Sequence, residues 1–181
     1  DAFHLVEAAA GDVLAGGLGD LVGPLGHVGS PSGGLVARLA KEGGDAPGDA
    51  LAVLRRLERG LGNAVEGVEI VPGRALANVL AHIPGTRPPI ATPSDWHLLV
   101  ELGAGAGDAD PLPRLEGALA ELFERGLVTD ATLAASEAQA DALWKLRDAI
   151  SEAERAIGPA IQHDISVPVA RMPEYIDSMP G

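Results

Sequence analysis

The sequence predicts an α+β fold, a sandwich in which a small, mainly antiparallel sheet is covered by helices on one face. Helical and strand patterns alternate strictly from residue 49 onward. Hydrophobic residues make up 46% of the chain but aromatic residues only 3%, which indicates a helix-rich core of Leu, Val, Ile and Ala. The alternative is a doubly wound parallel sheet. It is disfavoured because strands are few, their outer faces are partly polar, and glycine-rich phosphate loops are missing.

Residues 1–48 are the least regular part of the chain, since they hold 12 of its 24 glycines and no sustained apolar period. We expect a glycine-rich loop or a poorly ordered arm here, and the folded domain over residues 49–181. The glycines at 17, 19 and 23 do not predict a dinucleotide-binding loop. No convincing strand precedes them, and Pro24 stands where a helix should open.

Two helices and a strand are predicted between residues 49 and 83. Asp49 can cap the first helix, which Gly60 and Gly62 end. Its apolar residues repeat at helical spacing: Leu51, Leu54, Leu57 and Leu61. A strand follows over residues 64–71, with Glu69 projecting between apolar neighbours. Pro72 and Gly73 then open the second helix, which ends before Pro84.

The next stretch predicts strand, helix, strand and helix. Residues 96–102 form the clearest strand, with both faces mostly apolar. Asp110 and Pro111 open a helix that Gly126 closes. A short strand at residues 127–130 precedes Ser136, which forms a capping box with Gln139.

The helix from Leu143 to Ile157 carries the first candidate site. Its core-facing stripe consists of Leu143, Leu146, Ile150, Ala153 and Ile157. A second stripe of Trp144, Arg147 and Ser151 places a guanidinium one turn from a hydroxyl, which is a plausible anion-binding pair. The alternative, slightly favoured by spacing alone, is that Arg147 covers the sheet edge and pairs with Glu154 or Asp148.

A strand is predicted next, over residues 161–169. Gln162, Asp164 and Ser166 lie on one face of it and either complete a polar pocket or form a solvated face, the second again slightly favoured. Pro173 then opens a terminal helix.

Composition excludes several functions. A net charge of -13 argues against nucleic acid or an anionic membrane surface as partner. The absence of cysteine excludes disulfides and thiolate sites and fits a cytoplasmic protein. The five histidines lack metal-ligand spacing, so we expect no local metal site, and no catalytic residue is assigned. Glu69 and Glu101 are expected at strand edges or in salt bridges to Arg74.

Three stretches carry a family resemblance: VEGVEIVPGRALANVLAHIPGTRPPIATPSDWHLLVEL, GLVTDATLAASEAQADALWKLRDAISEA and HDISVPVARMPEYI. Together they resemble the C-terminal substrate domain of FAD-linked oxidases, in the D-2-hydroxyglutarate and D-lactate dehydrogenase group of vanillyl-alcohol-oxidase-like flavoenzymes. The resemblance implies a ferredoxin-like cap over a flavin held by a separate FAD-binding domain or subunit. It implies further that Arg147 grips a substrate carboxylate, that Ser151 supplies a second contact, and that Gln162 lies in the same site.

The sequence departs from this family in several ways. Gln162 stands where the family usually has lysine, and residues 1–48 lack the strand that the family places there. The resemblance places the family's His-x-Gly-Asp-Gly-Asn-x-His motif, with its divalent metal, after Gly181. Since the chain opens on Asp1 without methionine, we expect a piece of a longer polypeptide. Because the FAD domain and the histidine motif of the family are not in this sequence, we expect the piece to be inactive alone.

In the complete enzyme the resemblance implies oxidation of a D-2-hydroxy acid of the 2-hydroxyglutarate, lactate or glycolate type by hydride transfer to FAD. A second copy of the chain, in a homodimer, is the other partner considered. The alternative is a non-catalytic ferredoxin-like module that binds a small ligand or another protein, in which the Arg147 face is only a subunit interface.

Overall fold

The computed structural model describes residues 5–6, 32–39, 46–91, 93–103, 111–134, 136–159 and 166–179. Within them, five strands form one sheet, in the order β1 (Leu5–Val6), β5 (Val128–Leu133), β2 (Ser32–Leu39), β4 (Trp96–Gly103) and β3 (Val65–Pro72). Every neighbouring pair is antiparallel. The predicted α+β class with a small antiparallel sheet is therefore confirmed.

Six α-helices are described: α3 (Ala46–Leu61), α4 (Gly73–His82), α5 (Leu112–Glu124), α6 (Glu137–Asp148), α7 (Ile150–Ile157) and α8 (Met172–Ser178). The chain order β2-α3-β3-α4-β4-α5-β5 with the sheet order β5-β2-β4-β3 is the ferredoxin-like arrangement, enlarged by α4 between β3 and β4. Short 3₁₀ turns at Gly62–Ala64 and Val169–Arg171 follow α3 and precede α8.

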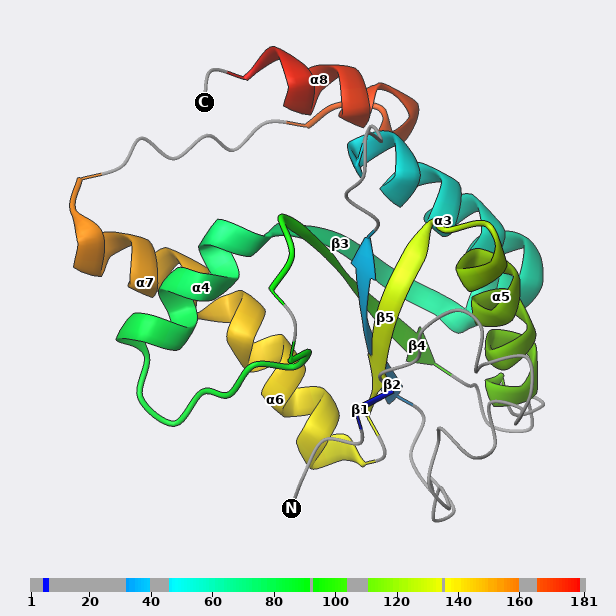
Figure 1. Cartoon of the computed structure of the whole chain (residues 1–181), viewed down its shortest axis with the longest axis horizontal. Coiled ribbons are helices and arrows are strands. Elements are labelled where there is room, and N and C mark those ends of the chain that lie inside the picture. The colour runs from blue at the N-terminus through cyan, green and yellow to red at the C-terminus, as the bar shows by residue number, and fades with distance from the viewer. Residues whose placement is uncertain are drawn as a thin grey trace.

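Helices cover both faces of the sheet. In Figure 1, α3 and α5 lie on one side of the strands, and α4, α6 and α7 lie on the other. The prediction of helices on one face only is therefore wrong. The physical reason lies in β4, where Leu98 and Leu99, which point to opposite faces, are 1% and 3% exposed. Two apolar faces need two layers of cover.

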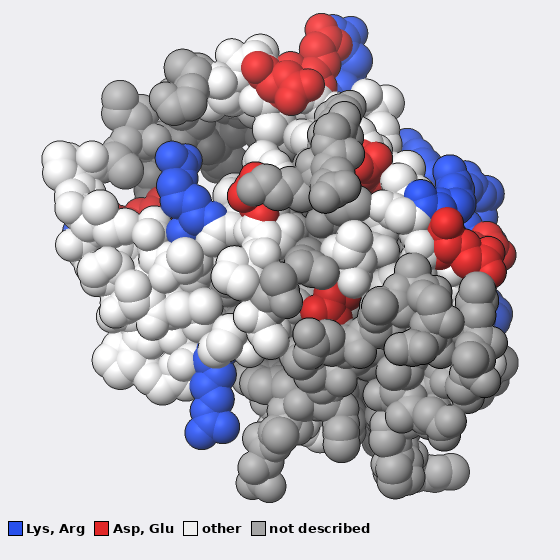
Figure 2. All heavy atoms as spheres, viewed as in Figure 1, with Lys and Arg blue, Asp and Glu red and all other residues white. Residues whose placement is uncertain are grey.

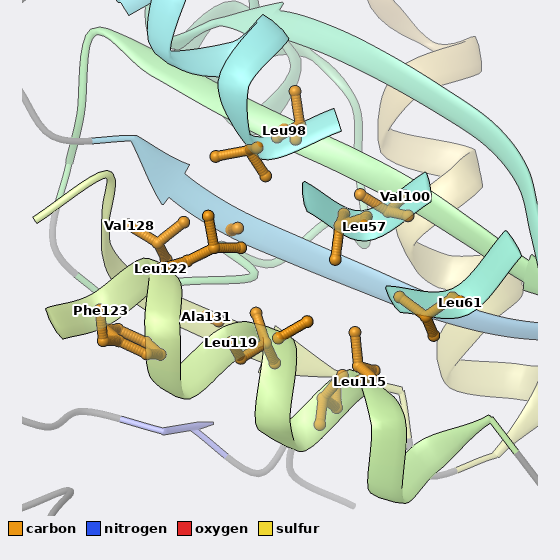
Figure 3. Close-up of a cluster of buried hydrophobic side chains, with 14 of the residues drawn as sticks. Leu57, Leu61, Leu98, Val100, Leu115, Leu119, Leu122, Phe123, Val128 and Ala131 are labelled. Atoms are coloured by element: carbon orange, nitrogen blue, oxygen red, sulfur yellow. The ribbon is translucent and has the colours of Figure 1, made fainter. Parts of the chain in front are cut away.

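The larger core fills the space between the sheet and the pair α3 and α5 (Figure 3). Apolar side chains of the three elements interdigitate there: Leu57 and Leu61 from α3, Leu115, Leu119 and Leu122 from α5, and Leu98 and Val100 from β4. Each fully buried leucine contributes roughly 1.5–3 kcal/mol of hydrophobic free energy. This layer thus holds the two ferredoxin-like helices against the sheet.

The opposite face has two smaller cores. Leu143 of α6 packs with Leu99 of β4 and with Ile90 from the loop after α4. Leu146 of α6 packs into a second cluster with α4, α7 and β3, whose buried members also include Val71, Leu76, Val79, Ala149 and Ala153. The apolar stripe predicted for residues 143–157 is confirmed as far as Ala153, whereas Ile157 is 56% exposed.

Strand β2 corrects the expectation that residues 1–48 contain no strand. It runs through Gly33 and Gly34 and pairs with β4 on one side and β5 on the other. Leu35 stands opposite Val100 in one neighbour and Leu133 in the other. Glycine weakens a strand, but here two ladders of backbone hydrogen bonds replace what local propensity lacks. Short β1 lies in the same segment and pairs with β5.

The helix predicted to run from Leu143 to Ile157 is interrupted. Ser136 caps α6 as expected, accepting a hydrogen bond from the backbone N–H of Gln139 at 3.3 Å. Ala149, with ψ −6°, then separates α6 from α7. Its N–H still donates to the Lys145 carbonyl oxygen, so the break is a local bend in a nearly continuous helix.

The strand predicted at residues 161–169 is wrong in its described part. Residues 166–168 are irregular, and Val169 already belongs to a 3₁₀ turn. Residues 161–165 lie outside the described residues, as does Asp110, the predicted cap of α5. The terminal helix with Pro173 in its first turn is confirmed.

An ion pair joins the two helices of the larger core at their outer surface. Arg56 of α3 donates through Nε and Nη2 to the two carboxylate oxygens of Glu121 in α5, at 2.5 and 2.7 Å. Figure 2 shows basic and acidic side chains side by side over this edge of the molecule. The hydrogen bond from Arg56 lowers the pKa of Glu121, with further help from Arg125 and Arg59, against a smaller effect of burial.

Gly73 joins three elements and generates the first prediction. It starts α4 directly after β3, and its N–H donates to the Asp95 carbonyl oxygen before β4 at 2.7 Å. A Cβ on Gly73 would overlap the Ser94 carbonyl oxygen, which is backbone and cannot swing away. We expect Gly73→Ala to lower the free energy of unfolding by about 1–3 kcal/mol, measured by urea titration.

The matched control is Gly117→Ala in α5, where an added Cβ meets no atom within 4 Å. Alanine should raise the free energy of unfolding there by about 0.5–1 kcal/mol. Equal effects of the two alanines would contradict the close approach at Gly73.

The second prediction concerns acid stability. A carboxylate with a lowered folded-state pKa stabilises the protein above its unfolded pKa of about 4.3, and this contribution is lost as the pH falls through the folded value. Glu121→Gln should therefore reduce the loss of stability below about pH 4.5, as followed by chemical unfolding at several pH values. Glu58→Gln, which alters an exposed pair within α3, is the control. If the free energy of unfolding of Glu121→Gln fell as steeply with decreasing pH as that of the wild type, the inter-helix pair would be contradicted.

Candidate functional site

Arg147 lies where α6 reaches the edge of the sheet. Leu143 and Leu146, which are 1% and 6% exposed, fix the helix against the second face. Arg147 follows directly in the last turn of α6, where a positive charge is favoured by the partial negative charge of the helix C-terminus. Its side chain is 45% exposed, so the guanidinium emerges at the surface from a rigid support.

Two carboxylates contact the guanidinium. Arg147 Nε donates to Glu69 Oε2 of β3 at 2.6 Å, and Nη1 donates to Asp148 Oδ1 at 3.3 Å. Asp148 is thus a partner of Arg147, as one alternative predicted. Glu69 was predicted to pair with Arg74 but pairs with Arg147. The pKa of Arg147 is raised above its ordinary value, first by the hydrogen bond that it donates to Glu69. The arginine stays charged at every physiological pH.

Trp144, one turn before Arg147 on α6, lies over the face of β3 that carries Glu69. A Cβ added to Gly67 would lie 4.0 Å from Trp144 Cη2, so the indole lies over the glycine. Gly67 and Glu69 are two residues apart in β3, so they lie on the same face of the sheet. Trp144 and Arg147 of α6 lie along that face. Glu101 stands opposite Gly67 in β4 and therefore faces the same side.

Glu69 is the partner of Arg147 that sequence reasoning missed. The alternation in β3 carried the signal, because it sends Val68 and Ile70 toward the larger core and Glu69 toward the opposite face. That face becomes informative only once α6 is known to cover it.

The other two predicted site residues are not brought to Arg147 by the described structure. Ser151 lies beyond the bend at Ala149, is exposed, and forms no hydrogen bond with Arg147. Gln162 lies outside the described residues, as does Asp164. A substrate-binding role for Arg147, Ser151 and Gln162 stays a prediction.

A small cavity of about 20 Å³ lies beneath Arg147. Its other lining residues are mostly apolar: Val71, Leu76, Pro89, His97, Leu99, Leu143 and Leu146. This volume holds about one water molecule. A molecule much larger than water does not fit beneath the guanidinium, so Arg147 is open to a ligand only from its exposed side.

A larger hollow of about 390 Å³ adjoins α8 and is lined by Val167, Pro168, Arg171, Glu174, Tyr175 and Ser178. The Arg171 guanidinium is held by Glu174 through Nε at 2.7 Å and Nη2 at 2.9 Å. Among the described residues, no three His, Asp or Glu side chains are grouped to hold a metal ion. No described helix is long and apolar enough to cross a membrane.

Comparison with known proteins gives one family. Residues 44–180 match the description "FAD linked oxidases, C-terminal domain". A mitochondrial D-2-hydroxyglutarate dehydrogenase of Arabidopsis thaliana is 28% identical over 129 residues, which cover 71% of this chain and 23% of that protein. D-2-hydroxyglutarate dehydrogenase of Xanthomonas citri pv. viticola is 34% identical over 114 residues, 62% of this chain and 23% of the relative.

The mitochondrial D-2-hydroxyglutarate dehydrogenase of Rattus norvegicus is 30% identical over 130 residues, 71% of this chain and 23% of the relative. The chain thus spans about a quarter of the length of these relatives. The stretches VTDATL and LWKLRD, which belong to the resemblance, form β5 and the end of α6 in the described fold. Because the match extends over most of the sequence, this chain belongs to the FAD-linked oxidases and corresponds to their C-terminal domain.

Proposed function

We propose that the chain is the substrate domain of an FAD-dependent dehydrogenase that oxidises a D-2-hydroxy acid of the 2-hydroxyglutarate, lactate or glycolate type. The family match and the D-2-hydroxyglutarate dehydrogenase relatives support this class of reaction. The observation that carries the proposal is a permanently charged guanidinium, 45% exposed, on a helix end that two buried leucines hold in place.

In this proposal Arg147 binds the substrate carboxylate. Its planar fork matches a carboxylate with two parallel hydrogen bonds, which fixes orientation as well as charge. Ser151 and Gln162 would supply neutral polar contacts to the same substrate. FAD, bound by a separate domain or subunit, would be the electron acceptor, and the chain alone would not turn over substrate. A divalent metal in the parent enzyme, a homodimer and a cytoplasmic location also stay predictions.

The pairing of Arg147 with Glu69 and Asp148 does not exclude this role. Exposed ion pairs contribute only about 0–1 kcal/mol to stability. A substrate carboxylate that forms two charge-assisted hydrogen bonds gains more than the single long contact with Asp148, at 3.3 Å, that it displaces. Removal of Arg147 should therefore affect substrate binding more than folding.

The third prediction tests this role in the complete FAD-containing enzyme. Arg147→Ala should lower kcat/KM for D-2-hydroxy acids roughly a hundredfold, about 2–3 kcal/mol, since one charge-assisted fork is lost. Arg147→Lys keeps the charge but loses the planar fork, so its kcat/KM should lie between those of the wild type and Arg147→Ala. Flavin reduction by D-2-hydroxyglutarate, D-lactate and glycolate is the measurement, and it also identifies the preferred acid.

Arg155→Ala is the matched control, because Arg155 is exposed on α7. An Arg147→Ala enzyme with unchanged kcat/KM would overturn the carboxylate role. If that variant instead altered the oligomeric state in sedimentation, the result would favour a non-catalytic ferredoxin-like module that uses this face as an interface.

A further inference from the structure

The two carboxylates at Arg147 occupy different parts of the guanidinium. Glu69 takes Nε at 2.6 Å, whereas Asp148 takes Nη1 at 3.3 Å. Nη2 donates no hydrogen bond to any described residue. A guanidinium can offer a carboxylate either the edge formed by Nε and Nη2 or the edge formed by Nη1 and Nη2. The first edge is blocked by Glu69, and the second is opposed only by one long contact.

The two acids also differ in their support. Glu69 belongs to β3, within the paired part of the sheet opposite Leu99, and is 34% exposed. Asp148 is the last residue of α6 and is 70% exposed. A half-buried carboxylate on a strand is held in place, while an exposed one at a helix end turns freely toward water. Glu69 is therefore the acid that can fix the plane of the guanidinium.

We infer that Glu69 is a positioning residue: it holds Arg147 through Nε so that the Nη1–Nη2 edge meets the substrate carboxylate. The inference rests on the carboxylate-binding role proposed for Arg147 and assigns the geometry of that contact. It separates the two neighbouring acids into one that orients the arginine and one that the substrate displaces.

The alternative is that both acids merely neutralise Arg147 and compete with substrate. The two ideas predict opposite changes in carboxylate affinity for the Glu69→Ala variant. If Glu69 positions the arginine, Glu69→Ala weakens carboxylate binding, because the released side chain must be ordered again on binding. If Glu69 only competes, Glu69→Ala strengthens it. Asp148→Ala should strengthen binding, or leave it unchanged, under both ideas, and so serves as the matched control.

The experiment uses the 181-residue chain labelled with ¹⁵N and followed by NMR at the arginine side chains. Arg147→Lys assigns the Nε–H signal of Arg147 by deleting it. In the wild type this proton should exchange with water about tenfold more slowly than that of exposed Arg155, because it is held in a short hydrogen bond to Glu69. Glu69→Ala should remove the difference, and Glu69→Gln, which keeps an acceptor oxygen, should restore most of it.

Titration with D-2-hydroxyglutarate and with D-lactate then gives the geometry. We expect the Nη signals of Arg147 to shift while the Nε signal keeps its slow exchange. Binding should weaken about fivefold or more in Glu69→Ala and recover in Glu69→Gln. Melting temperatures of the variants, expected within a few degrees of wild type because the pair is exposed, show that the fold is retained.

Three results would overturn the inference, and they are distinguishable. Loss of slow Nε exchange on adding either acid means that substrate displaces Glu69. Tighter binding in both Glu69→Ala and Asp148→Ala means simple competition. If neither acid moves any Arg147 signal while Nε remains protected, the carboxylate role of Arg147 itself fails, and the positioning role falls with it.

Discussion

The structure depends on the burial of β4 from both sides. This strand lies between β2 and β3, and from His97 to Val100 every residue is buried. Such a strand demands one layer of helices on each face, because neither face tolerates water. The pair α3 and α5 meets one demand in the ferredoxin-like manner. Helices α4, α6 and α7 meet the other, and they carry the candidate site.

The position of Arg147 follows from that second layer. Once Leu143 and Leu146 bind α6 to the sheet, the next residue must emerge over the edge strand, where the alternation of β3 presents Glu69. Helical spacing alone offered Arg147 as one of two alternatives and slightly favoured a structural role; the family resemblance made it a candidate for carboxylate binding. The sequence could not predict the partner, since that depends on which face of β3 the helix covers. Ser151 was predicted on the same stripe by assuming a straight helix, and the bend at Ala149 breaks that assumption.

Most elements of the fold were predictable because their signals are local. Proline and glycine mark the ends of α4 and α5, and a serine cap marks the start of α6. The failures share a different cause. Strand β2 contains adjacent glycines and is stabilised by its two neighbours, so no window of its own sequence indicates it. The alternation of polar and apolar residues after residue 160 is typical of a strand, but the described part of that segment forms no strand.

The place of β2 in the sheet bears on where the domain begins. The family match starts at residue 44, but the strand between β4 and β5 comes from residues 32–39. A truncation at the start of the match would remove the middle of the sheet and leave β5 with no bond to β4. The two halves of the ferredoxin-like unit would then face each other across an unfilled gap of one strand, about 10 Å between strand axes. Homology alone would thus set the boundary inside the domain, and an excised piece would expose two new sheet edges open to aggregation.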